Sequence, residues 1–247
     1  MKKFSLLMIL VLMIALLPAA LASAQDLHRS YNIGAGSYIR VQNISGDIRV
    51  IGVAGTTVAV DAVVVGPDRQ MISIEDLSTN NGIELRVKYP QTGNTNASVN
   101  FEVRVPSMVD YNFDRVNSVS GSVEVTGVRG RLKINSVSGE VTAKEITGTV
   151  NANSVSGDVM VELAHLEGTG DMKFNSVSGD VIVIAPAALG ADIEMSTLSG
   201  ALETNFPLQI EEKEFGPGRS ARGTVGAGGG YSLRLSTISG KVSLTGK

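Results

Sequence analysis

A carboxylate directly follows the glycine in several copies of a short repeated motif, and these carboxylates could bind a cation. Glu140, Asp158 and Asp180 follow the glycine of NSVSG segments, and Asp47 has the same place in a degenerate copy. If the copies stack, the carboxylates form a column about 4.8 Å apart, where like charges repel. Ca²⁺ could relieve that repulsion because it takes several oxygen ligands. Screening by water and salt is the alternative, and the GGxGxD turn of calcium-binding β-rolls is absent.

Serine also recurs in the motif, but no base accompanies it. The final serine of each copy would form a second column, made of Ser120, Ser138, Ser156, Ser178, Ser199 and Ser239. His28 and His165 are the chain's two histidines, and neither has the context of a catalytic triad or a metal site. A nucleophilic serine needs such a partner. The sequence therefore predicts no catalytic residue, no bound metal and no cofactor, and hence a protein that is not an enzyme.

The asparagine and the glycine of the motif are predicted to form corners of a stacked structure. The asparagines could present a ligand surface, or their amides could stack and hydrogen-bond the corner backbone. A glycine is expected where a side chain would clash or where φ must be positive. The predicted corners are Asn117, Gly121, Asn135, Gly139, Asn153, Gly157, Asn175, Gly179, Gly200 and Gly240.

The spacing of these motifs predicts the fold. NSVSG begins at Asn117, Asn135 and Asn153, 18 residues apart, and glycine recurs every nine residues between them. Counting each glycine as position one, apolar residues occupy the third, fifth and eighth positions, which is the alternation of strands with one buried face. We therefore predict an all-β, parallel β-helix-like solenoid with rungs of about 18 residues, each built from two nine-residue halves. Because the NSVSG valine holds the eighth position, it is predicted to point inward. Crossover rules favour a right-handed coil.

The period is lost at both ends of the repeat region. Residues 25–110 are predicted to form longer strands that cap or flank the stack, and residues 111–247 to form the regular repeats. Pro207, an acidic cluster and GPGRSARG interrupt residues 205–229, which are predicted to be a long surface loop. Residues 25–247 are long enough to form one β-solenoid domain around a common core.

The first residues predict export. Lys2 and Lys3 precede an apolar run, and Ala22-Ser23-Ala24 offers a cleavage site, so residues 1–24 read as a signal peptide that leaves no membrane span. The formal net charge of −3 becomes more negative without the two lysines, which argues against nucleic acid or an anionic membrane as partner. The chain has no cysteine, so disulfides are excluded. We expect the protein in the periplasm, at the cell surface or secreted.

The repeat also resembles a known family. The pattern [NS]-[ST]-[VIL]-S-G-x-V, the preceding VNFEVRVP at residues 99–106 and the closing segment 223–244 resemble the bacterial "putative adhesin" β-strand-repeat family, which is exported and of unknown function. The similarity covers most of residues 37–247. It implies a β-solenoid and a role in surface interaction, and it supplies no catalytic residues.

Three classes of function remain open. The first is a non-enzymatic, exported binding or adhesion module of the cell envelope, whose partner is an unknown protein or glycan. The second is a β-helix enzyme acting on polysaccharides, which would need acids with a base or metal. The third is an envelope scaffold that self-assembles through exposed terminal rungs. We favour the first, and the oligomeric state is left open.

Overall fold

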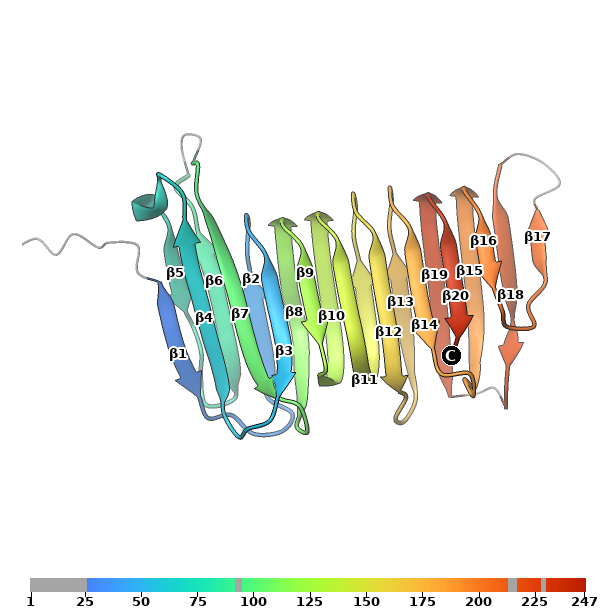
Figure 1. The fold of residues 1–247 in the computed structure, drawn as a ribbon, viewed down its shortest axis with the longest axis horizontal. Coiled ribbons are helices and arrows are strands. Elements are labelled where there is room, and N and C mark those ends of the chain that lie inside the picture. The colour runs from blue at the N-terminus through green and yellow to red at the C-terminus, as the bar shows by residue number, and fades with distance from the viewer. Residues whose placement is uncertain (1–25, 92–94, 213–216, 228–229) are drawn as a thin grey trace, which may run out of the picture.

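The computed structural model describes residues 26–91, 95–212, 217–227 and 230–247, so the predicted signal peptide lies outside the described residues. The chain is all-β and β-solenoid-like, an elongated stack of strands apart from one short 3-10 helix, η1 (Arg69–Met71) (Figure 1). In these described ranges no helix is long and apolar enough to cross a membrane.

The strands form two sheets that enclose the core between them. The front sheet of Figure 1 contains, in spatial order, β1 (Leu27–Tyr31), β4 (Val58–Val65), β7 (Ser98–Pro106), β3 (Ile48–Val53), β9 (Val123–Thr126), the first part of β11 (Val141–Asn153), β12 (Val159–His165), β14 (Val181–Ala185), β20 (Val242–Gly246) and β16 (Leu202–Thr204).

The back sheet follows the same axis. It contains β5 (Ser73–Asp76), β6 (Gly82–Lys88), β2 (Tyr38–Gln42), β8 (Asp110–Ser120), β10 (Arg129–Ser138), the second part of β11, β13 (Gly170–Asn175), β19 (Tyr231–Ser239), β15 (Ala191–Ser199), β18 (Arg219–Val225) and β17 (Ile210–Glu212).

One rung consists of a back strand followed by a front strand, and the rungs do not stack in sequence order. The rung β2/β3 lies between β6/β7 and β8/β9. At the other end, β19/β20 lies between β13/β14 and β15/β16. The last strands of the chain are therefore inserted into the stack instead of closing its end, which the repeat pattern did not predict.

The third and fifth positions of each half-repeat fill the core as expected. Val123, Val125, Leu132 and Ile134 are 0–1% exposed, and the equivalent apolar residues of later rungs are 0–7% exposed. Phe113 and Phe174 are the largest fully buried side chains. Each buried aliphatic side chain contributes about 1.5–3 kcal/mol, so the stack is stable only when several rungs pack together.

The prediction that the NSVSG valine points inward is wrong. Val119, Val137 and Val155 are each 45% exposed, while the preceding Ser118 and Ser136 are 3% and 4% exposed. The alternation of inward and outward side chains continues into this corner. The serine before the valine therefore points inward, and the valine points outward. At the opposite edge, eighth-position residues such as Val128 and Ile146 are buried. There the register irregularity between Ala143 and Ile146, with Glu145 at φ 55°, restores the inward direction.

Glycine is required at the NSVSG corners because neighbouring rungs approach too closely for a side chain. A Cβ at Gly139 would lie 2.2 Å from the carbonyl oxygen of Gly121, and one at Gly157 would lie 2.3 Å from that of Gly139. The same contact recurs at Gly179, where the distance to the Gly157 oxygen is 2.4 Å. We call this side of the stack, formed by the NSVSG, STISG, STLSG and NISG segments, the repeat edge.

The prediction of a loop over residues 205–229 is also wrong. The described part of this segment contains β17 and β18, and β18 pairs antiparallel with β15 along its length. Ala221 and Val225 of β18 are 2% exposed, so both side chains are part of the core. Charged residues and glycines surround them in the sequence. Antiparallel strands cover the N-terminal end as well, where β1 pairs with β4 and β5 with β6.

Replacing Gly139 by alanine should destabilise the fold by about 1–3 kcal/mol, because the new methyl group meets a backbone oxygen that cannot move without shifting a whole rung. Gly34→Ala is the matched control, since nothing lies within 4 Å of a Cβ at that position. Urea denaturation followed by circular dichroism measures both. Equal stability of the two variants would contradict the close-packing explanation.

Candidate binding surface

An unbroken chain of side-chain hydrogen bonds runs along the back of the repeat edge. The Nδ2 of Asn135 donates to Oδ1 of Asn117 at 2.7 Å, and Asn153 donates to Asn135 at 2.9 Å. Asn175 donates to Asn153 at 2.7 Å, and the Oγ of Ser236 continues the chain to Asn175. The amides therefore bond to one another and not to the corner backbone. We call these residues the amide column.

The corner backbone is instead bonded by the buried hydroxyl group of the next residue. Ser136 Oγ donates to the carbonyl oxygen of Gly121 at 3.0 Å, and Ser154 Oγ donates to that of Gly139 at 3.0 Å. Ser176, Thr237 and Thr197 repeat this bond on later rungs. Each hydroxyl is thereby satisfied inside the edge, which explains how a polar residue is buried there at low cost.

The carboxylates after the repeat glycines act on the backbone of the next rung. Asp158 Oδ1 accepts a hydrogen bond from the amide nitrogen of Asp180 at 2.8 Å, and Asp180 Oδ1 accepts one from Lys241 at 2.7 Å. Asp47 does the same for Ser122 at 2.9 Å. Glu140 differs, because it accepts a hydrogen bond from Thr142 on its own strand. Across the described residues, no group of three or more His, Cys, Asp or Glu side chains is arranged to hold a metal ion.

The two histidines lie away from the repeat edge. His28 Nδ1 lies 2.7 Å from Oδ1 of Asp61, and these residues belong to β1 and β4 at the N-terminal end of the front sheet. His165 ends β12 and is exposed. Neither side chain shares a described hydrogen bond with a serine of the motif, so the serine column has no neighbouring base within the described structure.

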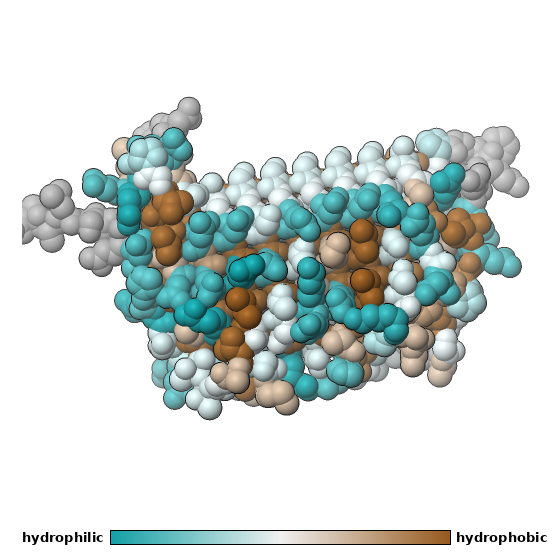
Figure 2. Space-filling model, viewed as in Figure 1, coloured by the Kyte–Doolittle hydropathy of each residue, from teal (hydrophilic) through white to brown (hydrophobic). Residues whose placement is uncertain are grey.

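The exposed residues of the repeat edge form a continuous apolar row. Their exposed fractions range from 41% to 50%, and in spatial order they are Ile44, Val119, Val137, Val155, Val177, Ile238 and Leu198. We call this row the aliphatic column. The NSVSG segments contain no charged residue, so the column is flanked by uncharged serine, asparagine and glycine. Figure 2 shows the upper edge as a regular band of pale residues, in contrast to the teal residues below it.

The aliphatic column ends in a shallow hollow of about 470 Å³. Val177, Ile238 and Leu198 line its apolar side, and Arg219 and Ser220 of β18 lie at its end. Strand β18, which lies between β15 and β17 in the back sheet, therefore also shapes the end of the exposed apolar surface.

A second apolar area lies on the front sheet. Met160, Ile182 and Ile184 point outward from the paired strands β12 and β14 and are partly exposed. Figure 2 shows brown residues in this part of the front face, between teal side chains. The area is short, because charged or polar residues occupy the neighbouring strands, and it is separate from the repeat edge.

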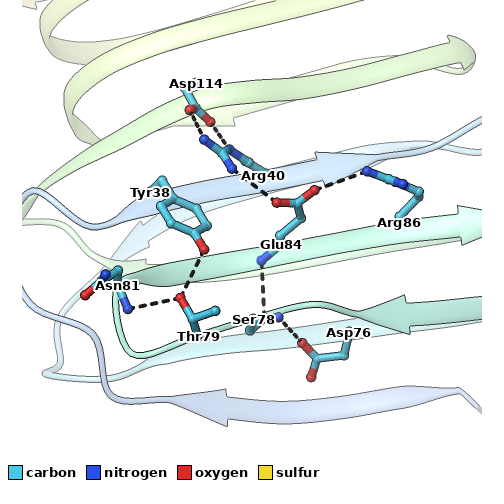
Figure 3. Close-up of polar contacts among 9 residues, drawn as sticks. All are labelled: Tyr38, Arg40, Asp76, Ser78, Thr79, Asn81, Glu84, Arg86 and Asp114. Atoms are coloured by element: carbon cyan, nitrogen blue, oxygen red, sulfur yellow. Dashed lines mark hydrogen bonds and ion pairs between the residues drawn. The ribbon is translucent and has the colours of Figure 1, made fainter.

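A charged network lies on the outer face of the back sheet near its N-terminal end (Figure 3). Arg40 Nε and Nη2 each donate to Asp114 at 2.7 Å, and Arg40 Nη1 lies 3.1 Å from Glu84 Oε2. Glu84 also contacts Arg86 at 3.3 Å, and the Arg40 guanidinium lies 4.2 Å from the centre of the Tyr38 ring. Hydrogen bonding to Arg40 holds the pKa of Asp114 below its ordinary value of 3.8.

Comparison with known proteins agrees with this geometry. The Toastrack DUF4097 family matches residues 34–245. The chain belongs to this family. The resemblance inferred from the order of the NSVSG segments is therefore confirmed. No curated protein matches the chain.

Solved structures resemble this chain at low sequence identity. A "putative cell adhesion protein" from Clostridium sporogenes is 11% identical with a TM-score of 0.51, and the match covers 90% of this chain and 100% of that one. A "putative adhesin" from Bacteroides fragilis is 14% identical with a TM-score of 0.39, covering 90% and 98%. At this identity the first match supports the fold, and the second adds no argument.

The sequence located the corners but missed the aliphatic column. Asn117, Gly121, Gly200, Gly240 and their equivalents lie along the repeat edge, and the column lies between the asparagines and the glycines. One signal was available in the sequence. A small hydroxyl residue precedes the valine, isoleucine or leucine in almost every copy, which is consistent with an inward serine or threonine and an outward aliphatic residue.

The backbone role of Asp158 makes a testable prediction. Asp158→Asn should keep nearly full stability, because an amide oxygen can still accept the Asp180 N–H bond. Asp158→Ala should lose about 1 kcal/mol, since it removes the acceptor. Thermal melts with Ca²⁺ and with a chelator should coincide for all three proteins. A rise in Tm with Ca²⁺ that disappears in both variants would instead support a cation site in the acid column.

The Asp114–Arg40 contact predicts a dependence of stability on pH. Because the folded-state pKa of Asp114 is lowered, the ionised carboxylate stabilises the fold above the unfolded pKa near 3.8 and loses this effect as pH falls through the folded value. Asp114→Asn should therefore be less stable than the unsubstituted protein at pH 7, with the difference shrinking below pH 4. Urea unfolding at several pH values measures it. A difference that does not change with pH would contradict this role.

Proposed function

We propose that this protein is an exported, non-enzymatic binding module that acts like an adhesin at the cell envelope, with a protein or glycan partner. The coil is proposed to be right-handed, with rungs of two nine-residue halves. The name of the C. sporogenes neighbour, a "putative cell adhesion protein", supports this class of function.

The aliphatic column is the observation that carries the proposal. Water-exposed aliphatic side chains contribute nothing to solubility, and a contiguous row of them commonly marks an interaction site. Here the row extends over successive rungs without a charge in the NSVSG copies, so a partner can contact many equivalent positions. Repetition of one weak contact along the stack raises the overall strength of binding, as in other multivalent systems.

Binding to isolated bacterial envelopes tests the proposal. The purified protein should co-sediment with envelopes, and a variant carrying Val137→Thr, Val155→Thr and Val177→Thr should bind at least about tenfold more weakly. Threonine keeps the β-branched shape and strand propensity while replacing one methyl group by a hydroxyl.

Val63→Thr with Val65→Thr is the matched control, because these β4 valines are 39% and 40% exposed and lie outside the column. The control should bind like the unsubstituted protein. Absence of co-sedimentation, or equal losses in both variants, would contradict the proposed function.

A further inference from the structure

The register of the back sheet brings basic residues from distant parts of the chain into one row. Arg40 of β2 pairs with Arg115 of β8, and Lys133 of β10 lies opposite the irregularity that contains Arg115. Lys133 pairs with Asn151, Asn151 with Lys173, and Lys173 with Arg234. We call these residues, Arg40, Arg115, Lys133, Asn151, Lys173 and Arg234, the cation column.

The middle of this column carries more positive than negative charge, because Asp114, the acid beside it, is shared between Arg40 and Arg115. Arg115, Lys133 and Lys173 are exposed, and none of them has an ion pair within the described part of the chain. The nearest acids on the row are already engaged, because Asp114 is held by Arg40 and Glu194 by Arg222 and Arg234. Like charges on neighbouring strands repel, so this arrangement weakens the sheet unless an anion binds there.

The cation column lies beside the amide column, and this arrangement determines which chemical groups of a ligand could bind. Lys133 and Lys173 are two residues before Asn135 and Asn175 on the same strands, so their side chains lie on the same outer face. Each amide has two N–H donors and two acceptor lone pairs, and the ladder uses one of each in Asn135 and Asn153. The remaining donors and acceptors are available to hydroxyl groups of a ligand.

A third row completes the surface. Val137 and Val177 follow Asn135 and Asn175 by two residues and are 45% and 41% exposed. Cations, amides and aliphatic side chains thus run in three neighbouring rows along the same rungs. A sugar with a carboxylate has the matching groups, because it offers negative charge, hydroxyl groups and apolar C–H faces.

We propose that this surface binds a linear acidic polysaccharide that lies along the solenoid axis and crosses successive rungs. Its carboxylates would contact Arg115, Lys133 and Lys173, its hydroxyl groups the amide column, and its C–H faces the aliphatic column. Rungs repeat about every 4.8 Å, so the unpaired lysines of β10 and β13 lie about 10 Å apart across β11, a distance of roughly two sugar units in an extended chain.

The same surface is poorly suited to nucleic acid. Proteins that bind single-stranded nucleic acid combine a basic groove with aromatic side chains on which bases stack. The described neighbours of Lys133 and Lys173 in the three rows are Arg115, Arg234, amides, hydroxyls and aliphatic groups, with no aromatic ring among them. The polysaccharide proposal rests on the proposed envelope function, and it names the partner's chemistry.

Binding of fluorescently labelled polygalacturonate, measured by anisotropy, tests the proposal. The unsubstituted protein should bind at low ionic strength and weaken as salt screens the contacts. Lys133→Gln should reduce affinity by roughly two- to fivefold, and Lys133→Gln with Lys173→Gln by about the product of two such losses. Lys144→Gln is the matched control, since Lys144 is an exposed lysine on a neighbouring part of β11 that belongs to the front sheet. It should bind within about twofold of the unsubstituted protein.

Other outcomes would overturn the inference. These are no binding of polygalacturonate at low salt, equal binding of neutral dextran, tighter binding of an oligothymidylate of equal charge, or the same loss in Lys144→Gln as in Lys133→Gln. Envelope co-sedimentation of the same protein separates the two proposals. If envelopes are bound but polygalacturonate is not, the binding function stands and the acidic-polysaccharide assignment fails.

Discussion

Close approach of neighbouring rungs at the repeat edge is the constraint on which the rest of the structure depends. Each glycine there passes directly over a carbonyl oxygen of the rung beneath, at a distance that no Cβ can share. That contact allows the backbone hydrogen bonds to continue around the corner, for example from Gly139 to Ser156 and from Gly157 to Ser178. The two sheets are held at a fixed spacing as a result, and every side chain is placed directly above its equivalent.

Exact stacking converts a sequence repeat into rows of like side chains, and the chemistry of each row decides whether stacking stabilises or strains the fold. Amides stack well, because each is both donor and acceptor, and the bonds from Asn117 to Asn175 form without a break. Asp47, Asp158 and Asp180 stack because each accepts a backbone N–H from the next rung, as Asp158 does from Asp180. The unpaired lysines gain no such bond, which distinguishes their row from the structural ones.

Much of this architecture could be predicted from the sequence, and the failures have physical causes. The third and fifth positions were buried as expected, because strand alternation is a local property that the sequence displays directly. The direction of Val137 could not be obtained from spacing alone, since both corners of a rung reverse the alternation but at different points: before the eighth position at the edge that contains Glu145, and after it at the repeat edge. The strands β17 and β18 were not predicted, because this segment has few apolar residues and they lie among glycine, proline and charged residues.

The cation column could not be predicted, because it depends on which rungs are neighbours in space. Arg234 joins Lys173 only through the insertion of β19 between β13 and β15, and Arg40 joins Arg115 only through the insertion of β2 between β6 and β8. A net negative charge for the whole chain therefore gave a misleading view of one face. Composition gives only the net charge of the chain, whereas binding depends on how charged side chains are arranged on one surface.

The same two insertions have a consequence for the order in which the protein can fold. Rungs from β8 to β14 contact their sequence neighbours, so they can assemble progressively as short-range contacts form. The rung β15/β16 pairs with β19/β20, which is the last part of the chain to be synthesised. It therefore cannot reach its final position until β19/β20 has entered the stack. Such late, long-range closure is slow relative to local pairing. The native stack is therefore completed only after the final strand is available, so the C-terminal strands control the last step of folding.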